Sequence, residues 1–117
     1  MNTEKRIAFY TITPLGDLAK TANAIAVALN VELRPDSSGN YEEFPAFVGL
    51  ADGWHLALLG NPMPEDDLRA HPTSDFELQV RVIESRVDFE TTGKVDEFIV
   101  GNLSTNGVLA VANGWGT

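Results

Sequence analysis

The pattern that most constrains this chain is a pair of short apolar segments separated by a tight-turn dipeptide. Residues 46–51 and 54–59 are rich in aliphatic and aromatic side chains, and Asp52-Gly53 lies between them. Asp-Gly accepts the positive φ angles of a type I′ turn, whose twist matches that of two antiparallel strands. The sequence therefore predicts a β-hairpin in the middle of the chain and a fold built around antiparallel strands.

The segment before the hairpin predicts a strand followed by a helix. Residues 6–12 mix aromatic and β-branched side chains, as in a strand covered on both faces. Thr13 and Pro14 offer a capping oxygen and a preset φ, so we expect a helix over 14–29. Its apolar stripe consists of Leu15, Leu18, Ala22, Ile25 and Leu29, and its other faces carry Asp17, Lys20, Thr21 and Asn23.

After this helix the sequence predicts a helix end, a short strand and a loop. Asn30 suits the left-handed turn that closes a helix. Residues 31–34 then alternate apolar and charged side chains, as in a second strand, and residues 35–40 hold the Pro, Asp, Ser and Gly typical of a loop.

The last third of the chain predicts a strand, a helix and a final strand. Residues 76–82 alternate apolar and polar side chains, as in a strand with one wet face. We expect a turn at 91–93, then a helix that Gly107 ends, then a buried strand at 108–111 and a loose tail at 113–117. The helical spacing is carried by Val95, Phe98, Ile99 and Leu103, with Asp96 and Glu97 in the first turn.

The predicted element order is β-α-β-β-β-β-α-β. At 117 residues the chain is long enough for one domain and too short for two, so residues 1–117 are expected to form a single domain. The fold class is therefore α+β, with a largely antiparallel sheet packed against two helices on one face.

The amino-acid composition excludes several classes of site and partner. The chain has no cysteine, which excludes disulfides, thiolate metal sites and a cysteine nucleophile. Its formal charge of −9 has the wrong sign for docking on nucleic acid or anionic lipid. No apolar run is long enough for a membrane helix or a signal peptide, so we expect a cytoplasmic protein that contacts neither nucleic acid nor membrane directly.

The negative charge is concentrated in the middle of the chain. Residues 35–78 hold nine acids and one base, a formal charge of −8. Within this segment, residues 60–75 form a long connection with three prolines and four carboxylates. A connection of that length in a compact domain is typically functional or mobile.

Catalytic and metal-binding interpretations find little in the sequence. His71 and Asp75 are residue types that ligate zinc or manganese, but the spacing of a four-ligand site is missing. His55 beside Trp54 fits a cross-strand residue better than a general base. No nucleophile elbow and no phosphate-binding glycine motif occurs. We therefore expect no enzyme activity, no cofactor and no bound metal.

A binding function has more support. Carboxylates around an aromatic anchor complement a cationic protein surface, because charge speeds the encounter and the aromatic ring supplies affinity. The alternatives are that the tryptophan belongs to the core and that the acidic run only stabilises a helix start. The predicted partner-binding residues are Asp52, Trp54, Glu65, Asp66, Asp67 and Asp75.

The run EEFPAFVGLADGWHLALLGNPMPEDDLR, leading into FELQVRV, resembles immunity proteins of bacterial polymorphic-toxin and contact-dependent growth-inhibition systems. The resemblance covers mainly residues 42–82. It implies a non-catalytic cytoplasmic antidote that binds one cognate toxin domain with a basic surface, often a nuclease, and acts as a monomer or weak homodimer.

Two other functions remain open at this point. One is a small regulatory or ligand-binding domain that self-associates through its sheet, which would show a wide apolar sheet face with Trp54 exposed. The other is a metal-dependent hydrolase, which would need His55 or His71 to converge with at least two carboxylates in a pocket.

Overall fold

The predicted element order is confirmed in the computed structural model, which describes residues 7–37, 41, 44–51, 54–61, 74–83 and 89–116. The elements are β1 (Ile7–Ile12), α1 (Leu18–Leu29), β2 (Arg34–Pro35), β3 (Ala46–Ala51), β4 (Trp54–Leu59), β5 (Phe76–Val82), α2 (Phe89–Thr105) and β6 (Ala110–Gly116). They form one α+β fold.

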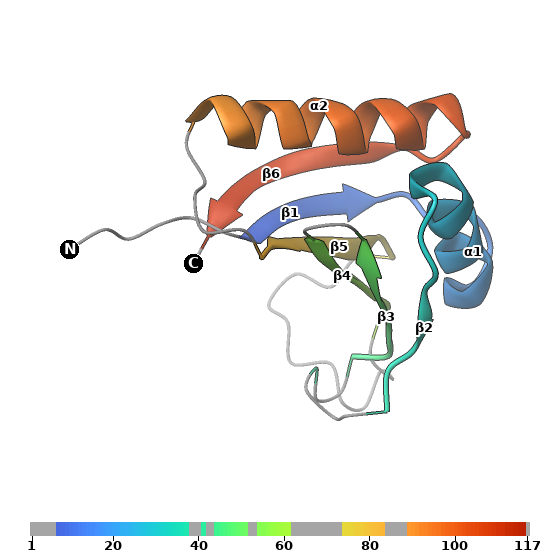
Figure 1. Ribbon diagram of the computed structural model, residues 1–117. Coiled ribbons are helices and arrows are strands. Elements are labelled where there is room, and N and C mark those ends of the chain that lie inside the picture. The colour runs from blue at the N-terminus through green and yellow to red at the C-terminus, as the bar shows by residue number, and fades with distance from the viewer. Residues whose placement is uncertain are drawn as a thin grey trace.

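All six strands belong to one antiparallel sheet, in the order β2-β3-β4-β5-β1-β6. The first strand of the chain is therefore an interior strand, between β5 and β6. The two helices lie on the same side of the sheet (Figure 1). Helix α2 runs along β6 and β1, and helix α1 lies near the C-terminal end of β1. The predicted hairpin is confirmed, since β3 pairs with β4 from Ala46 opposite Leu59 to Ala51 opposite Trp54. Its Asp52-Gly53 turn lies outside the described residues.

The alternation of side chains along β5 defines the two faces of the sheet. Leu78 and Val80 are buried and point to the helices, whereas Glu77, Gln79 and Arg81 point the other way. We call this second side the outer face. The strand register places the outward residues of β4 and β1 beside those of β5, so the outer face also carries His55, Ala57, Leu59, Ile7, Phe9 and Thr11.

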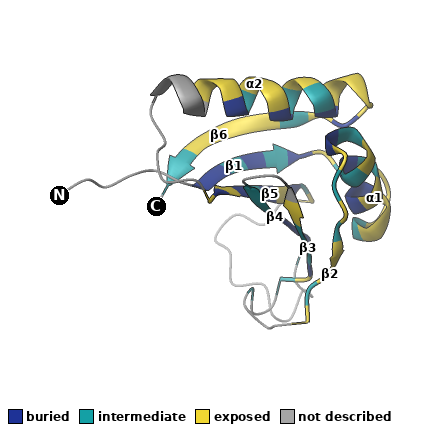
Figure 2. Ribbon diagram, in the orientation of Figure 1, coloured by how far each residue is buried: buried dark blue, intermediate teal, exposed yellow. Residues whose placement is uncertain are grey.

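The core lies between the sheet and the two helices (Figure 2). Each helix contributes three buried apolar residues at helical spacing, which are Ala22, Ile25 and Leu29 from α1 and Val95, Ile99 and Leu103 from α2. The strands contribute Ala8, Tyr10, Ile12, Leu56, Leu58, Phe76, Leu78 and Val80. Neither of these helices, over the part of the chain that is described, is long and apolar enough to span a membrane.

The carboxylate of Asp96 joins α2 to the core side of the sheet through two hydrogen bonds. The hydroxyl of Tyr10, which is fully buried, donates to Asp96 Oδ1 at 2.6 Å. Trp115 Nε1 on β6 donates to the same oxygen at 3.2 Å. A carboxylate on the helix thus satisfies donors from two neighbouring strands, as buried polar groups require.

The start of α1 differs from the prediction. The helix begins at Leu18, and its N-cap is Asp17, whose Oδ1 accepts the backbone N–H of Lys20 at 2.8 Å. Thr13 is not the cap because the helix begins only at Leu18; its N–H instead donates to Leu109 O at 3.1 Å, next to the Ile12–Ala110 pair of β1 and β6. The predicted Asn30 ending is confirmed, with φ of 55°.

The buried stripe of α1 also differs. Thr21, which we predicted to lie off the stripe, is fully buried, whereas Leu15 precedes the helix and is exposed. Burial is tolerated because the Thr21 hydroxyl donates to Asp17 O and accepts the Leu15 N–H, each at 2.9 Å.

The predicted strand at 31–34 is mostly wrong, since β2 comprises only Arg34 and Pro35. The preceding residues pass so close to β3 that a Cβ on Gly49 would overlap the carbonyl oxygen of Glu32 and lie 2.9 Å from Leu33 Cδ2. This segment therefore packs on the helix side of the sheet instead of pairing beside β3.

The C-terminal predictions need three corrections. The expected turn at 91–93 is helical, because α2 begins at Phe89, although Gly107 does end the segment with φ of 81°. The tail at 113–116 is not loose, since it continues β6 along β1. Val108 is buried as predicted but precedes β6, which begins at Ala110, and Leu109 and Val111 are exposed; Val111 pairs with Thr11 and so points to the outer face.

Candidate functional site

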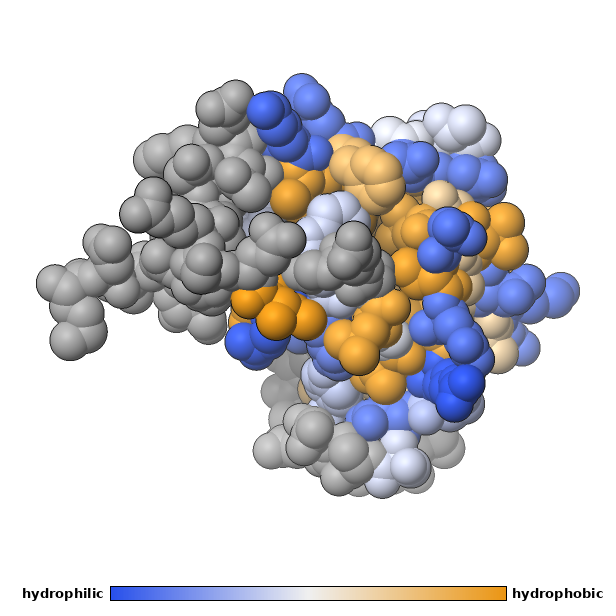
Figure 3. All heavy atoms as spheres, viewed as in Figure 1, coloured by the Kyte–Doolittle hydropathy of each residue, from blue (hydrophilic) through white to orange (hydrophobic). Residues whose placement is uncertain are grey.

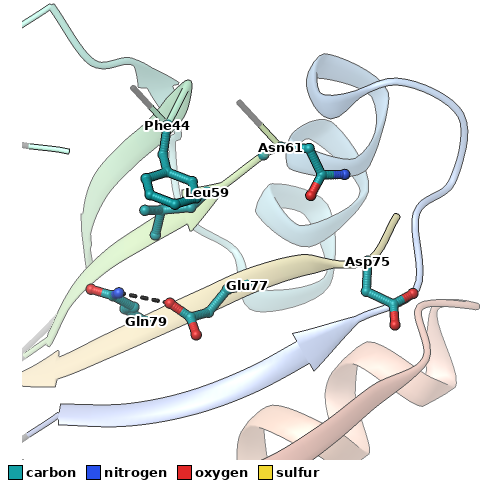
Figure 4. A pocket seen from close by; sticks show the side chains of 7 residues that line it. Phe44, Leu59, Asn61, Asp75, Glu77 and Gln79 are labelled. Carbon is teal, nitrogen blue, oxygen red and sulfur yellow. Dashed lines mark hydrogen bonds between the residues drawn. The ribbon is translucent and has the colours of Figure 1, made fainter. Parts of the chain in front are cut away.

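A hollow of about 250 Å³ opens on the outer face, where β4 ends and β5 begins. Figure 4 shows Phe44 beside Leu59 on one side and polar side chains along β5 on the other. The described residues that line it are Phe44, Leu59, Gly60, Asn61, Asp75, Glu77 and Gln79.

Strand alternation positions the polar wall of this hollow. Glu77 and Gln79 are two residues apart on β5, so their side chains point to the same face, and Asp75, which directly precedes the strand, also lines the hollow. Antiparallel pairing then sets Glu77 directly opposite Leu59 on β4 and opposite Thr11 on β1. An ionisable side chain thus stands next to an apolar one across the strand pair.

The apolar wall belongs to a second, smaller core on the outer face. Leu59, Ala57 and Ala46 are buried there, and Phe44, Tyr41 and Val48 pack against them. Phe44 is held by its backbone N–H, which donates to Tyr41 O at 3.0 Å. This packing gives the hollow a fixed apolar side that includes one aromatic ring.

The chain leaves β4 at a glycine that lies close to α1. The Gly60 N–H donates to Pro45 O at 2.8 Å, and a Cβ on Gly60 would lie 2.9 Å from Leu18 Cδ2 and 3.2 Å from Pro45 Cγ. The close approach between the strand end and α1 fixes the position of Asn61.

The two ends of the long acidic connection meet at the hollow. Asn61 Nδ2 donates to the backbone oxygen of Ser74 at 3.1 Å. Asp75 follows directly and Glu77 lies two residues further on, and both line the hollow. The predicted length of the connection, 60–75, is therefore confirmed at its two described ends.

The charged groups that line the hollow, among the described residues, are all negative. Gln79 Nε2 donates to Glu77 Oε2 at 2.8 Å and orients that carboxylate. None of the described lining residues carries a positive charge, and two carry a carboxylate. Arg81 lies further along β5, opposite His55, so the positive charge of this strand sits toward its other end.

Tyr41 packs on the smaller core of the outer face, beside the hollow. Partial burial raises the pKa of Tyr41, the negative charge of Asp36 raises it further, and the positive charge of Arg81 offsets part of the effect. The phenol is therefore close enough to both charged groups to sense them, and it stays protonated at neutral pH.

The structure places two of the six predicted partner-binding residues, and it separates them. Asp75 lines the hollow on the outer face. Trp54 begins β4 at the opposite end of the β4–β5 pair, opposite Val82, and points to the helix side. Asp52, Glu65, Asp66 and Asp67 lie outside the described residues.

The environment of Trp54 is that of a packed aromatic side chain. Its ring contacts Phe98 of α2 edge to face, with centroids 5.3 Å apart and planes at 68°. Trp54 is partly buried and packs on the main core, whereas 45% of Phe98 is exposed. The alternative that Trp54 belongs to the core is thus supported by its contacts.

Sequence reasoning missed most of the hollow. Glu77 and Gln79 could have been grouped with Asp75, because the period of two along 75–79 puts them on one face. Phe44, Leu59 and Asn61 carry no such local signal, since their placement depends on the β4–β5 register and on the contact with α1.

Within the described ranges, no group of three or more histidine, aspartate and glutamate side chains is arranged to hold a metal ion. His55 is partly buried on the outer face between Leu50 and Arg81, and His71 lies outside those ranges. What the hollow offers is negative charge, amide groups and one aromatic ring, which suits recognition of a cation.

Comparison of the chain with protein-family models, with curated proteins and with solved structures found no match.

Proposed function

We propose that this protein is a non-catalytic binding protein of the immunity type, which recognises a basic partner domain in the cytoplasm through an acidic surface. The observation that carries the proposal is the placement of Asp75 and Glu77. Both line a hollow on the outer face, at the point where the acidic connection leaves and re-enters the sheet.

Charge supports a cationic partner. The formal charge is −9, and residues 35–78 account for −8 of it. A nuclease-like toxin domain has a basic surface because it binds phosphates, so a carboxylate-rich protein can bind to the same surface. The resemblance of residues 42–82 to immunity proteins points to the same class of partner.

Self-association is the second candidate. It is favoured by β6, a seven-residue edge strand on which 62% of Val111 is exposed. The outer face weighs against it, because its central strand carries Glu77, Gln79 and Arg81 and not a wide apolar surface. Figure 3, in the view of Figure 1, shows apolar side chains with hydrophilic ones between them on the side turned to the viewer.

The test begins with capture of partners from the source organism at low salt, followed by co-expression. We expect a basic protein that inhibits growth when expressed alone and is neutralised by this chain, with an association rate that falls steeply as salt rises. Asp66→Lys with Asp67→Lys should weaken the complex and leave thermal unfolding unchanged. A captured protein whose toxicity persists beside this chain, or binding unaffected by the double reversal and by salt, would reject the proposal.

A further inference from the structure

We propose that the hollow between β4 and β5 receives one arginine side chain of the partner protein. The inference rests on the proposed function and adds to it the group that the basic partner presents. Three features of the hollow carry it, namely its size, its two chemically different walls and the charge that faces it.

The size of the hollow limits its occupant. Pockets that hold small-molecule ligands and cofactors have volumes of roughly 300–1,000 Å³. The hollow measures about 250 Å³ and is lined by only seven described residues. It is therefore matched to a single side chain and not to a cofactor or a folded segment.

The two walls match the two parts of a long basic side chain. Leu59 is buried and Phe44 half-buried, and together they form a surface on which an aliphatic stem can lie. Across the strand pair stands Glu77, which can bind the charged head, and Asp75, which directly precedes β5, adds a second negative charge to the lining. A lysine or arginine that enters along Phe44 would reach Glu77.

The arrangement of the carboxylate favours arginine over lysine. Gln79 already holds Glu77 Oε2 at 2.8 Å, and a carboxylate accepts up to about four hydrogen bonds, so the oriented group retains capacity for a forked donor. Guanidinium binds carboxylates with two parallel hydrogen bonds, stacks on aromatic rings such as Phe44, and is less strongly hydrated than ammonium.

The charge of the residues around the hollow also favours a positively charged occupant. Among the residues described around the hollow, none places a positive charge in its lining, and the guanidinium of Arg81 lies toward the other end of the strand. A cation that enters here meets two carboxylates and, among the described lining residues, no basic side chain.

The experiment titrates the whole ¹⁵N-labelled protein with short capped peptides and follows amide chemical shifts. The probes are acetyl-Gly-Arg-Gly-amide, the same peptide with citrulline, which has the shape of arginine without its charge, and the same peptide with lysine. We expect millimolar binding of the arginine peptide, with the largest shifts at Asn61, Glu77 and Gln79. Citrulline should give none, and lysine should bind more weakly.

Two variants locate the binding. Glu77→Gln removes one charge from the hollow and should weaken the arginine peptide about two- to fivefold, the range for an exposed ion pair. Glu97→Gln removes the same charge from the exposed side of α2 and should leave the affinity unchanged. Both substitutions are at exposed positions, so both proteins should fold.

The outcomes separate this inference from the proposed function. Shifts scattered over the surface, equal shifts with citrulline, equal binding of the lysine peptide, or equal losses in the two variants would overturn the arginine site whatever partner is captured. An arginine-specific response at the hollow, together with no basic protein neutralised by this chain, would instead overturn the immunity function and leave the site standing.

Discussion

Tyr10 and Asp96, which are 86 residues apart in the chain, are joined by a 2.6 Å hydrogen bond from the tyrosine hydroxyl to the carboxylate. Tyr10 lies on the interior strand β1 and Asp96 on the helix that covers it, so the bond fixes α2 against the sheet. The same carboxylate oxygen accepts Trp115 Nε1 from the edge strand β6. This one residue therefore ties the last two elements of the fold to the first.

Asp96→Ala should destabilise the protein more than Tyr10→Phe. The alanine leaves two donors without an acceptor, one of them the fully buried Tyr10 hydroxyl, and should cost about 1–3 kcal/mol. Tyr10→Phe removes a donor from a carboxylate that keeps Trp115 and should cost about 1 kcal/mol. Urea denaturation measures both, with Asp96→Asn as the control that keeps an acceptor oxygen. The reverse order of the two costs would contradict the assigned geometry.

The stability of the protein should fall at alkaline pH through Tyr10. Burial, followed by the hydrogen bond to Asp96 and the charge of Asp96, raises the pKa of this phenol far above its ordinary value of about 10. Below about pH 10 both states keep the proton and the stabilisation is complete. Above it only the unfolded chain ionises, so the free energy of unfolding declines by up to ~1.4 kcal/mol per pH unit.

Comparison with two variants isolates this effect. Denaturation of wild type and Tyr10→Phe between pH 9 and 11 should show a shallower decline for the variant. Tyr41→Phe is the control, because the pKa of Tyr41 is raised in the same direction but its ring is less buried. Parallel pH profiles for wild type and Tyr10→Phe would show that Tyr10 does not contribute the decline.

Two glycine-to-alanine substitutions should have opposite effects. Gly49→Ala places a methyl group against the Glu32 carbonyl and Leu33 Cδ2, so we expect a loss of about 1–3 kcal/mol. Gly101 lies on the exposed side of α2 with nothing within 4 Å of an added Cβ, so its alanine variant should gain about 1 kcal/mol. Thermal unfolding of both variants measures the difference. A neutral Gly49→Ala would mean that the 31–33 segment does not pass over β3 at this distance.

Much of this fold was predictable, because its signals are local. The Asp-Gly dipeptide between two apolar runs identified the hairpin, and the alternation along 76–82 identified β5 with its wet face. Where the structure departs from the sequence prediction, distant partners decide. Thr13 is drawn into the sheet by Leu109, and residues 113–116 become strand because the free edge of β1 accepts them.

The hollow was predictable only in part for the same reason. The period of two assigns Asp75, Glu77 and Gln79 to one face, but not which apolar residue stands opposite them. That pairing follows from the β4–β5 register, which places Leu59 opposite Glu77, 18 residues further along the chain. The meeting of Asn61 with Ser74, across 13 residues, likewise has no local signature.

The last prediction concerns the edge-to-face contact of Trp54 with Phe98. If the aromatic pair joins the hairpin to α2, Trp54→Leu and Phe98→Leu should be coupled, and the double variant should lose about 0.5–1.5 kcal/mol less than the sum of the single losses. Urea denaturation of the four proteins measures the coupling. As a control, Trp54→Leu combined with Val27→Ala, an exposed residue on α1, should show additive losses. Additive losses for the Trp54–Phe98 pair itself would remove the ring contact as a source of stability and would return Trp54 to consideration as an anchor for the partner.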